Sequence, residues 1–406
     1  MLSVFSSHLS HAGRYLRDIA DADSVILQDG TFSLIHVPLA LYSSFLRPIL
    51  QVLLPQRSGC GGNDGSNVED RGLTGDSQHG FLSISVTPVE CSVVCHSSWV
   101  RSVFEPAIKK LPKDAASRRT VTVSKDSYAV FSVISAGMDA GSRVVDLTSP
   151  LALAGIPIFF ITTYYSDFIL VPNKERQSVV KALLSRGFEF SEDESAFRTA
   201  GPQAHSRAPS NSSDPPSTPP PSSVAELQVR TFALLKRRHV VPYAEDGLRL
   251  IHCSGREQSS LRNYSDRPSR PAGNGSRVRS WVDTVDTKLY TGIVSALASQ
   301  PRFLSITLAQ EDPPSLLLDR ELLNMFGDSL VGPTDGALVP IFLDLDDLPL
   351  EATGIVSGVA AKLVHEMMES AELSYLSTAR AGAVILSGEQ SAKALEVLKA
   401  SLTKEG

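Results

Sequence analysis

The chain has 406 residues, of which 42% are hydrophobic and 20% are charged, and its formal net charge is −6. This length exceeds that of one typical domain, so we expect more than one folding unit. The negative charge argues against general affinity for nucleic acid or an anionic membrane surface, and we expect neither as a partner. The richest apolar stretch, 156–171, is interrupted by polar residues, which predicts no membrane span. The N-terminus has no basic region before an apolar core, so we expect a cytoplasmic protein.

The first half of the chain predicts the order strand, helix, strand, strand, helix twice over. Apolar alternation indicates strands, and a 3.6-residue apolar period indicates helices. The first unit has a strand at 33–37, a helix at 39–54, strands at 81–86 and 91–94, and a helix at 99–108. The second unit has a strand at 128–135, a helix at 142–154, strands at 157–163 and 168–171, and a helix at 174–185.

Three segments have too few apolar residues to build a core. Residues 201–223 are rich in Pro and Ser and predict a disordered linker. Residues 56–80 are rich in Gly and predict a loose insertion within a domain. Residues 256–279 predict a solvated loop insertion. The linker divides the chain into halves of similar size.

The second half predicts the same order of elements, which gives four βαββα units with boundaries near 24–112, 120–190, 225–330 and 336–403. Such a unit is an α+β fold of the ferredoxin-like kind, with an antiparallel sheet and helices on one face. An internal repeat supports the division, because 161–171 matches 376–386 without gaps at an offset of 215. Two units side by side can join their sheets and form a cleft at the shared edge.

The residues carry no motif of a common enzyme class. A P-loop, a G-x-G-x-x-G loop, a nucleophile elbow and an H-E-x-x-H helix are all missing from the sequence, and we expect a protein that is not an enzyme. Asp344, Asp346 and Asp347 follow an apolar strand and indicate a strand end more than a metal cluster. Cys91 and Cys95 lie on one face of a predicted strand, which favours a structural role over half of a metal site. We therefore expect neither a metal nor a cofactor, and four cysteines are too few for a disulfide framework.

The segment IPIFFITTYYSDFILV at 156–171 follows a helix with an internal proline and resembles the second ACT domain of the CASTOR family. These proteins are cytosolic arginine sensors that act upstream of the TOR kinase complex. The resemblance extends over about 140–190 and continues more weakly in TGIV at 353–356, YLST at 375–378 and LALY at 39–42. It implies four ACT domains in one chain, paired across the linker.

The resemblance also implies a ligand site between the second and fourth ACT domains. An amino-acid zwitterion needs N–H donors near its carboxylate and C=O acceptors near its ammonium, and a helix N-terminus behind Gly354 supplies donors. By position, the family's ligand-binding residues correspond here to Pro157, Ile158, Glu351, Ala352, Thr353, Gly354, Ile355, Thr378, Ala379 and Gly382.

At this site the sequence departs from the family in the residues that would bind arginine. A guanidinium needs acidic partners, but Ala352 and Gly382 stand where the family has its acids, and Glu351 is displaced by one residue. Pro157 also lacks a main-chain donor. We therefore expect arginine to bind poorly and a small neutral amino acid to bind better. Arg380 in the same turn either favours an acidic or neutral ligand or is simply an exposed turn residue.

The resemblance places a contact with the GATOR complex at Tyr164, Tyr165 and Asp167, in a turn between two predicted strands. Consecutive strand residues point to opposite faces, so we expect at least one tyrosine to be exposed. An exposed aromatic side chain beside a fixed charge is typical of a binding hot spot.

Three functions remain open from the sequence. The first is a non-catalytic amino-acid sensor in TOR nutrient signalling, with a GATOR-like complex as partner. The second is an ACT-type allosteric subunit of an amino-acid biosynthetic enzyme, and the third is a scaffold that has lost its ligand. The sequence leaves the oligomeric state open, a homodimer included.

Overall fold

The computed structural model describes residues 24–54, 80–111, 121–134, 140–190, 221–256, 286–309, 312–367 and 372–403. Most of the predicted linker and of the insertions at 56–80 and 256–279 lies outside these ranges, as does Cys60. Ser223, which the prediction included in the linker, is the N-cap of a helix and accepts a hydrogen bond from the Glu226 N–H. Among the described helices, none is long and apolar enough to cross a bilayer.

The predicted order of elements recurs four times along the chain, and we call these segments the first to fourth repeats. The first holds β2 (Phe32–Val37), α2 (Tyr42–Leu53), β3 (Phe81–Val86), β4 (Cys91–His96), α3 (Ser97–Trp99) and α4 (Glu105–Lys109). The second holds β6 (Tyr128–Ile134), α5 (Ala140–Leu153), β7 (Phe159–Thr162), β8 (Asp167–Pro172) and α6 (Arg176–Leu184). The third holds β10 (Leu250–Gly255), α9 (Thr287–Ala298), β11 (Leu304–Ala309), β12 (Ser315–Asp319) and a 3₁₀ helix, Arg320–Met325. The fourth holds β14 (Leu338–Asp344), α10 (Ile355–Met367), β15 (Ser374–Ser377), β16 (Ala381–Ser387) and α11 (Gly388–Leu402).

Further elements extend these repeats at the sheet edges and on the surface. They include the short strands β1 (Ser24–Leu27), β5 (Thr122–Val123), β9 (Glu189–Phe190) and β13 (Leu330–Val331) and helix α7 (Val224–Arg237). Short helical turns at Leu39–Leu41, Val100–Phe104 and Asn173–Glu175 adjoin the helices of the first and second repeats. The α7 helix packs on α10, α5 and α11, which places it with the second and fourth repeats instead of at the start of the predicted domain 225–330.

The first and third repeats pair across the predicted linker, and so do the second and fourth. Strands β3 and β11 pair in antiparallel fashion along their whole length, from Val86 opposite Leu304 to Phe81 opposite Ala309. Strands β7 and β15 join through one residue pair, Ile161 opposite Leu376. The predicted antiparallel arrangement therefore holds within each pair of repeats.

The two pairs of repeats join into one sheet, an arrangement that the sequence analysis did not address. Strand β2 pairs with β6 at Phe32 and Tyr128, and β10 pairs with β14 at Leu250 and Leu338. These bonds close a ring of 12 strands, and all neighbouring strands are antiparallel except β1 and β9 on an outer branch. Open strand edges present unpaired N–H and C=O groups, and pairing them satisfies these groups.

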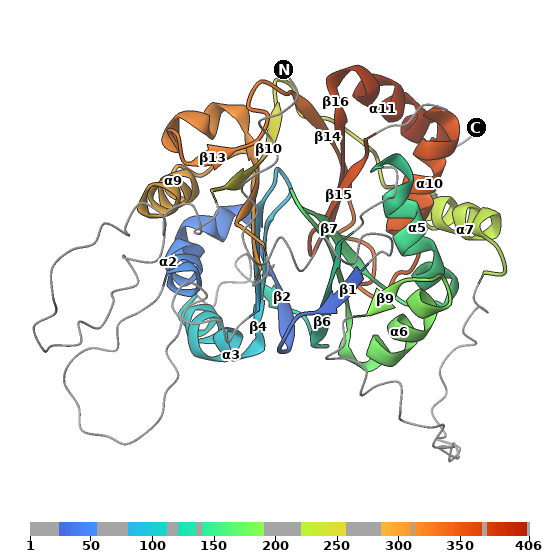
Figure 1. The fold of residues 1–406 in the computed structure, drawn as a ribbon, viewed down its shortest axis with the longest axis horizontal. Coiled ribbons are helices and arrows are strands. Elements are labelled where there is room, and N and C mark those ends of the chain that lie inside the picture. The colour runs from blue at the N-terminus through green and yellow to red at the C-terminus, as the bar shows by residue number, and fades with distance from the viewer. Residues whose placement is uncertain are drawn as a thin grey trace, which may run out of the picture.

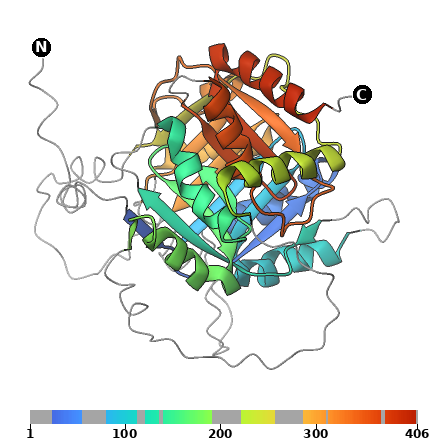
Figure 2. The ribbon, with the colours of Figure 1, turned by 90° about the vertical axis from the view of Figure 1, so that its right-hand side faces the viewer.

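Helices cover the outer faces of the closed sheet, as Figure 1 shows with α2, α3 and α9 on one side and α5, α6, α7 and α10 on the other. Figure 2 views the second of these layers face on. The predicted apolar faces of two helices are confirmed, because Phe45 and Ile49 of α2 and Val144, Leu147 and Leu151 of α5 are fully buried. Besides the apolar side chains under the helices, a separate apolar cluster that includes Phe168 and Phe342 fills the inner face of the sheet.

Candidate functional site

A cavity of about 60 Å³ lies where the second and fourth repeats meet, and we call it the junction pocket. Its walls come from the segment before α10, the first turn of α10, the end of α5, the start of β7, and the turn between β15 and β16. The lining residues are Ala152, Ile158, Phe159, Leu345, Leu348, Pro349, Leu350, Ala352, Gly354, Ile355, Val356, Ser357, Tyr375, Ser377, Thr378, Ala379 and Ala381.

The junction pocket brings together six of the ten residues predicted from the family resemblance: Ile158, Ala352, Gly354, Ile355, Thr378 and Ala379. Pro157, Glu351, Thr353 and Gly382 do not line it. Glu351 is exposed, so its carboxylate does not replace the family's acid inside the cavity.

Gly382 leaves room for a residue that sequence reasoning missed. A Cβ atom at Gly382 would overlap the phenolic oxygen of Tyr375, so the tyrosine occupies the space that a carboxylate would need. Tyr375 is buried, and its Oη has no hydrogen-bond partner among the described residues. Burial raises the pKa of this phenol, which keeps the hydroxyl of this pocket-lining residue protonated and able to donate a hydrogen bond.

The N-terminus of α10 forms the second polar wall of the junction pocket. Gly354 precedes the helix with φ +80°, a conformation that favours glycine. Its carbonyl accepts hydrogen bonds from the Gly358 N–H at 2.7 Å and from Thr231 Oγ1 of α7 at 3.1 Å. The first N–H groups of a helix have no carbonyl partner within the helix, so they can bind an anionic group.

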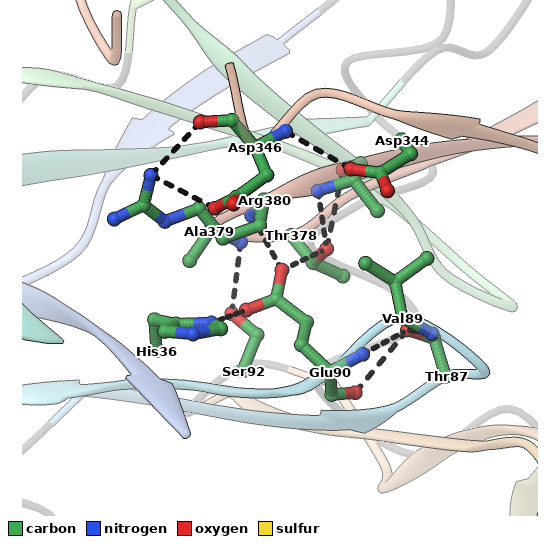
Figure 3. A network of polar contacts seen from close by, with 11 residues as sticks. His36, Thr87, Val89, Glu90, Ser92, Asp344, Asp346, Thr378, Ala379 and Arg380 are labelled. Atoms are coloured by element: carbon green, nitrogen blue, oxygen red, sulfur yellow. Dashed lines mark hydrogen bonds and ion pairs between the residues drawn. The ribbon is translucent and has the colours of Figure 1, made fainter. Parts of the chain in front are cut away.

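A buried carboxylate from the first repeat holds the turn that forms the third wall, as Figure 3 shows. Glu90 follows β3 and is fully buried. Its Oε1 accepts hydrogen bonds from Thr378 Oγ1 at 2.7 Å and from the Arg380 N–H, and its Oε2 lies 2.5 Å from His36 Nδ1. The Ala379 N–H donates to Ser92 Oγ at 3.2 Å. No sequence pattern marks Glu90, because its partners are 54 and 288 positions away.

Arg380 does not reach the junction pocket. Its guanidinium lies 3.1 Å from the Asp346 carboxylate and also donates to the Asp346 carbonyl. Asp344 ends β14 and accepts a hydrogen bond from the Asp346 N–H at 3.0 Å, which confirms the predicted strand end and turn. The ion pair between Arg380 and Asp346 therefore joins two turns of the fourth repeat.

The predicted partner-binding residues separate into a surface residue and two that face inward. Tyr165 is 47% exposed, which confirms that at least one tyrosine of the turn is accessible. Tyr164 is half-buried, and its ring contacts His252 with centroids 5.7 Å apart. Asp167 is 1% exposed, and its Oδ2 lies 2.6 Å from Arg143 Nε. The predicted partner contact of Asp167 is therefore wrong, because its carboxylate is buried inside the protein and a partner cannot reach it.

Cys91 and Cys95 lie on the same face of β4, in the apolar cluster that α2 covers, where burial raises the pKa of both thiols. This arrangement agrees with the predicted structural role. The described residues include no group of three or more His, Cys, Asp or Glu side chains that could hold a metal ion.

Comparison with known families identifies the second repeat. Residues 123–185 match the ACT domain. ACT domains are ligand-binding regulatory domains, and this one contributes the α5 and β7 walls of the junction pocket. Sequence comparison with curated proteins gives no match.

The solved structures that are similar to this chain share little sequence with it. A protein from Agobacterium tumefaciens is 19% identical over 42% of this chain and 94% of its own, with a TM-score of 0.26. Aspartate kinase from Synechocystis is 11% identical over 94% of this chain and 56% of its own, with a TM-score of 0.30. The regulatory subunit of aspartate kinase from Thermus thermophilus is 11% identical over 40% and 96%, with a TM-score of 0.25.

Proposed function

We propose that this chain is a non-catalytic regulatory protein of four ACT domains that binds a small neutral amino acid in the junction pocket. On this proposal it is a cytosolic sensor of the CASTOR kind. It signals ligand binding to the TOR pathway through contact with a GATOR-like complex. The ACT match in the second repeat and the recurrence of its element order in the other three support the first part. The family resemblance of 156–171 supports the second.

The observation that carries the proposal is the Tyr375 hydroxyl. It is buried, lacks a partner among the described residues and lines the same cavity as the first turn of α10. An unpaired buried donor is costly, and a ligand that accepts its hydrogen bond removes that cost. The helix N-terminus and Tyr375 together provide donors for a carboxylate.

The size of the junction pocket selects among amino acids. A water-sized group needs roughly 10–15 Å³ of such space, so a cavity of about 60 Å³ holds about four to six non-hydrogen atoms, the size of glycine or alanine. Arginine has about twice that number and would need acids that this lining lacks. Both features favour a small neutral ligand.

The lining also favours binding over catalysis. Among its residues, Tyr375 is the one side chain with an ionisable group, and its raised pKa places it far from the range of an effective general acid or base. We therefore propose that the bound amino acid is a signal and not a substrate.

A thermal-shift screen of the twenty amino acids tests this function. Glycine or alanine should raise the Tm of the full chain by several degrees when it is about a hundredfold above its Kd. The variant Ala352→Leu fills the junction pocket and should abolish that shift, whereas Ala298→Leu, on an exposed position of α9, should keep it. A glycine or alanine shift that survives in Ala352→Leu, or no shift with either of these two amino acids, would contradict the proposal, and no shift with any amino acid would favour a ligand-free scaffold.

A further inference from the structure

The repeat of 215 residues is also a pseudo-twofold relation in space. It matches Ile161 with Leu376, and these two residues are the pair that joins β7 to β15. Two hydrogen bonds beside them obey the same relation: the Phe160 N–H donates to Ser377 Oγ at 3.0 Å, and the Tyr375 N–H donates to Thr162 Oγ1 at 3.0 Å. Any site on one side of this axis therefore has a counterpart on the other.

The counterpart of the junction pocket exists, and we call it the mirror pocket. It is a cavity of about 410 Å³ whose lining includes Leu373, Thr163 and Tyr164, which the repeat matches with Ile158, Thr378 and Ala379 of the junction pocket. One exchange helps to explain the difference in volume. Phe159 borders the junction pocket, and its match in the mirror pocket is Ser374. A volume of this size lies within the range of small-molecule sites, roughly 300–1,000 Å³.

The charges of the mirror pocket differ from those of the junction pocket. Arg143 of α5 lines it, while the repeat places Gly358 at the matching position of α10. The Arg143 Nε lies 2.6 Å from Oδ2 of buried Asp167 as an ion pair, without the geometry of a hydrogen bond, and within the described part of the chain its two terminal nitrogens form no hydrogen bond or other ion pair. A guanidinium that is oriented through one edge can present the other edge to a carboxylate.

Two further polar groups face the same cavity. His252 of β10 lines it, and its Nε2 is buried without a hydrogen-bond partner among the described residues. Burial, with a smaller effect of Arg143, lowers the pKa of His252 to about 4, so the ring is neutral near pH 7. Glu372 at the rim is exposed and offers a partner for an ammonium group.

We propose that the mirror pocket is a second ligand site, which binds an amino acid larger than alanine with its carboxylate on Arg143 and a hydrogen bond to His252. The Leu250, Leu338 and Ile385 side chains give it an apolar wall. The proposal is independent of the junction pocket, since no residue lines both cavities.

The test uses the full chain with Ala352→Leu, in which the junction pocket is filled. A thermal-shift screen of the twenty amino acids should find at least one larger amino acid that stabilises this variant. Calorimetry with that amino acid should then show at least a tenfold loss of affinity in two further variants. One is the double variant Arg143→Gln/Asp167→Asn, which removes both charges of the buried pair together. The other is Ser374→Phe, which copies Phe159 of the junction pocket and narrows the cavity without changing either residue of the ion pair.

The amino alcohol derived from the same amino acid should not bind, because it lacks the carboxylate. The proposal is overturned if no amino acid stabilises Ala352→Leu, if binding persists in Ser374→Phe, or if the amino alcohol binds as well as the amino acid. If the double variant does not fold, the results with Ser374→Phe and the amino alcohol still decide. Failure here leaves the response of the wild-type chain to alanine unaffected, so the two pockets are judged separately.

Discussion

Ile161 and Leu376 face each other as the single residue pair that joins β7 to β15, and they are also matched by the internal repeat. A residue pair related to itself by the repeat lies on the axis of pseudo-twofold symmetry. The axis creates two clefts from one arrangement of strands and helices, and sequence divergence has made them chemically different. The junction pocket has a tyrosine hydroxyl and a helix N-terminus, whereas the mirror pocket has an arginine and a histidine.

The Glu90 carboxylate should contribute strongly to stability, because it is buried and accepts hydrogen bonds from Thr378 and Arg380. Changing Glu90→Gln replaces charged acceptors with a neutral amide. We expect the free energy of unfolding in denaturant to fall by about 2–3 kcal/mol. The control Glu105→Gln removes an exposed carboxylate whose Lys109 partner is 3.7 Å away, and it should change stability by less than about 0.5 kcal/mol. Equal effects of the two changes would show that the buried network adds little.

Asp167 should make stability depend on pH in an unusual direction. Burial raises the pKa of its carboxyl to about 6, although Arg143 and Thr162 act in the opposite direction. The unfolded value is about 3.9, so the folded state binds more protons between the two values and loses stability as pH rises from about 4 to 6.

The variant Asp167→Asn removes this titration. The unfolding free energy of the wild type minus that of the variant should be larger at pH 4 than at pH 7, by about 2 kcal/mol. Denaturant unfolding of both proteins across this range measures the difference. A difference that rises with pH would mean that the attraction of Arg143 outweighs burial.

Gly354 should tolerate a side chain less well than another glycine with positive φ. An added Cβ at Gly354 would lie 2.5 Å from Leu227 Cδ1, whereas at Gly155 (φ +72°) it would meet nothing within 4 Å. Gly155→Ala should cost about 1–2 kcal/mol from backbone strain alone. Gly354→Ala should cost about 1–2 kcal/mol more because Leu227 must shift. Thermal unfolding of the two variants tests this, and equal costs would show that α7 adapts freely.

Substitutions of Tyr165 and of Tyr164 should have different effects, the first on partner binding and the second on stability. Tyr165 is exposed, although its ring contacts that of Tyr164 with centroids 4.9 Å apart, so Tyr165→Ala should weaken a protein partner's binding while lowering stability by no more than about 1 kcal/mol. Tyr164 packs on His252, so Tyr164→Ala should lower stability measurably. Pull-down of a GATOR-like complex, with Tm measured in parallel, separates the two effects. Undiminished capture by Tyr165→Ala would exclude this residue as a contact.

The sequence predicts the elements well where a local pattern determines them. The apolar period of 39–54 predicted α2, and the gapless repeat matched Ile161 with Leu376 in sequence, although their pairing in the sheet was not predicted. Closure of the sheet between Phe32 and Tyr128 was not predictable, because it depends on how two pairs of repeats meet.

For the candidate site, the sequence predicted which backbone segments border the cavity but not which side chains supply its polar groups. The resemblance placed Gly354, Thr378 and Ala379 at the cavity, since their positions follow from the fold. Tyr375 and Glu90 escaped prediction because each acts alone and its role depends on long-range packing. Asp167 was assigned to a partner contact because it follows two tyrosines in the sequence. Nothing in the local sequence indicates that its carboxylate is buried and paired with Arg143.

Calorimetry on the variant Ser374→Phe, which leaves the junction pocket as the open cavity, tests the central claim most directly. We predict that alanine or glycine binds more tightly than 1 mM, about −4 kcal/mol, and that arginine does not. Adding Tyr375→Phe, which removes one hydroxyl, should weaken binding of the small amino acid about tenfold, equivalent to about 1.4 kcal/mol. Micromolar binding of arginine, or binding of alanine that is unchanged by Tyr375→Phe, would contradict the account.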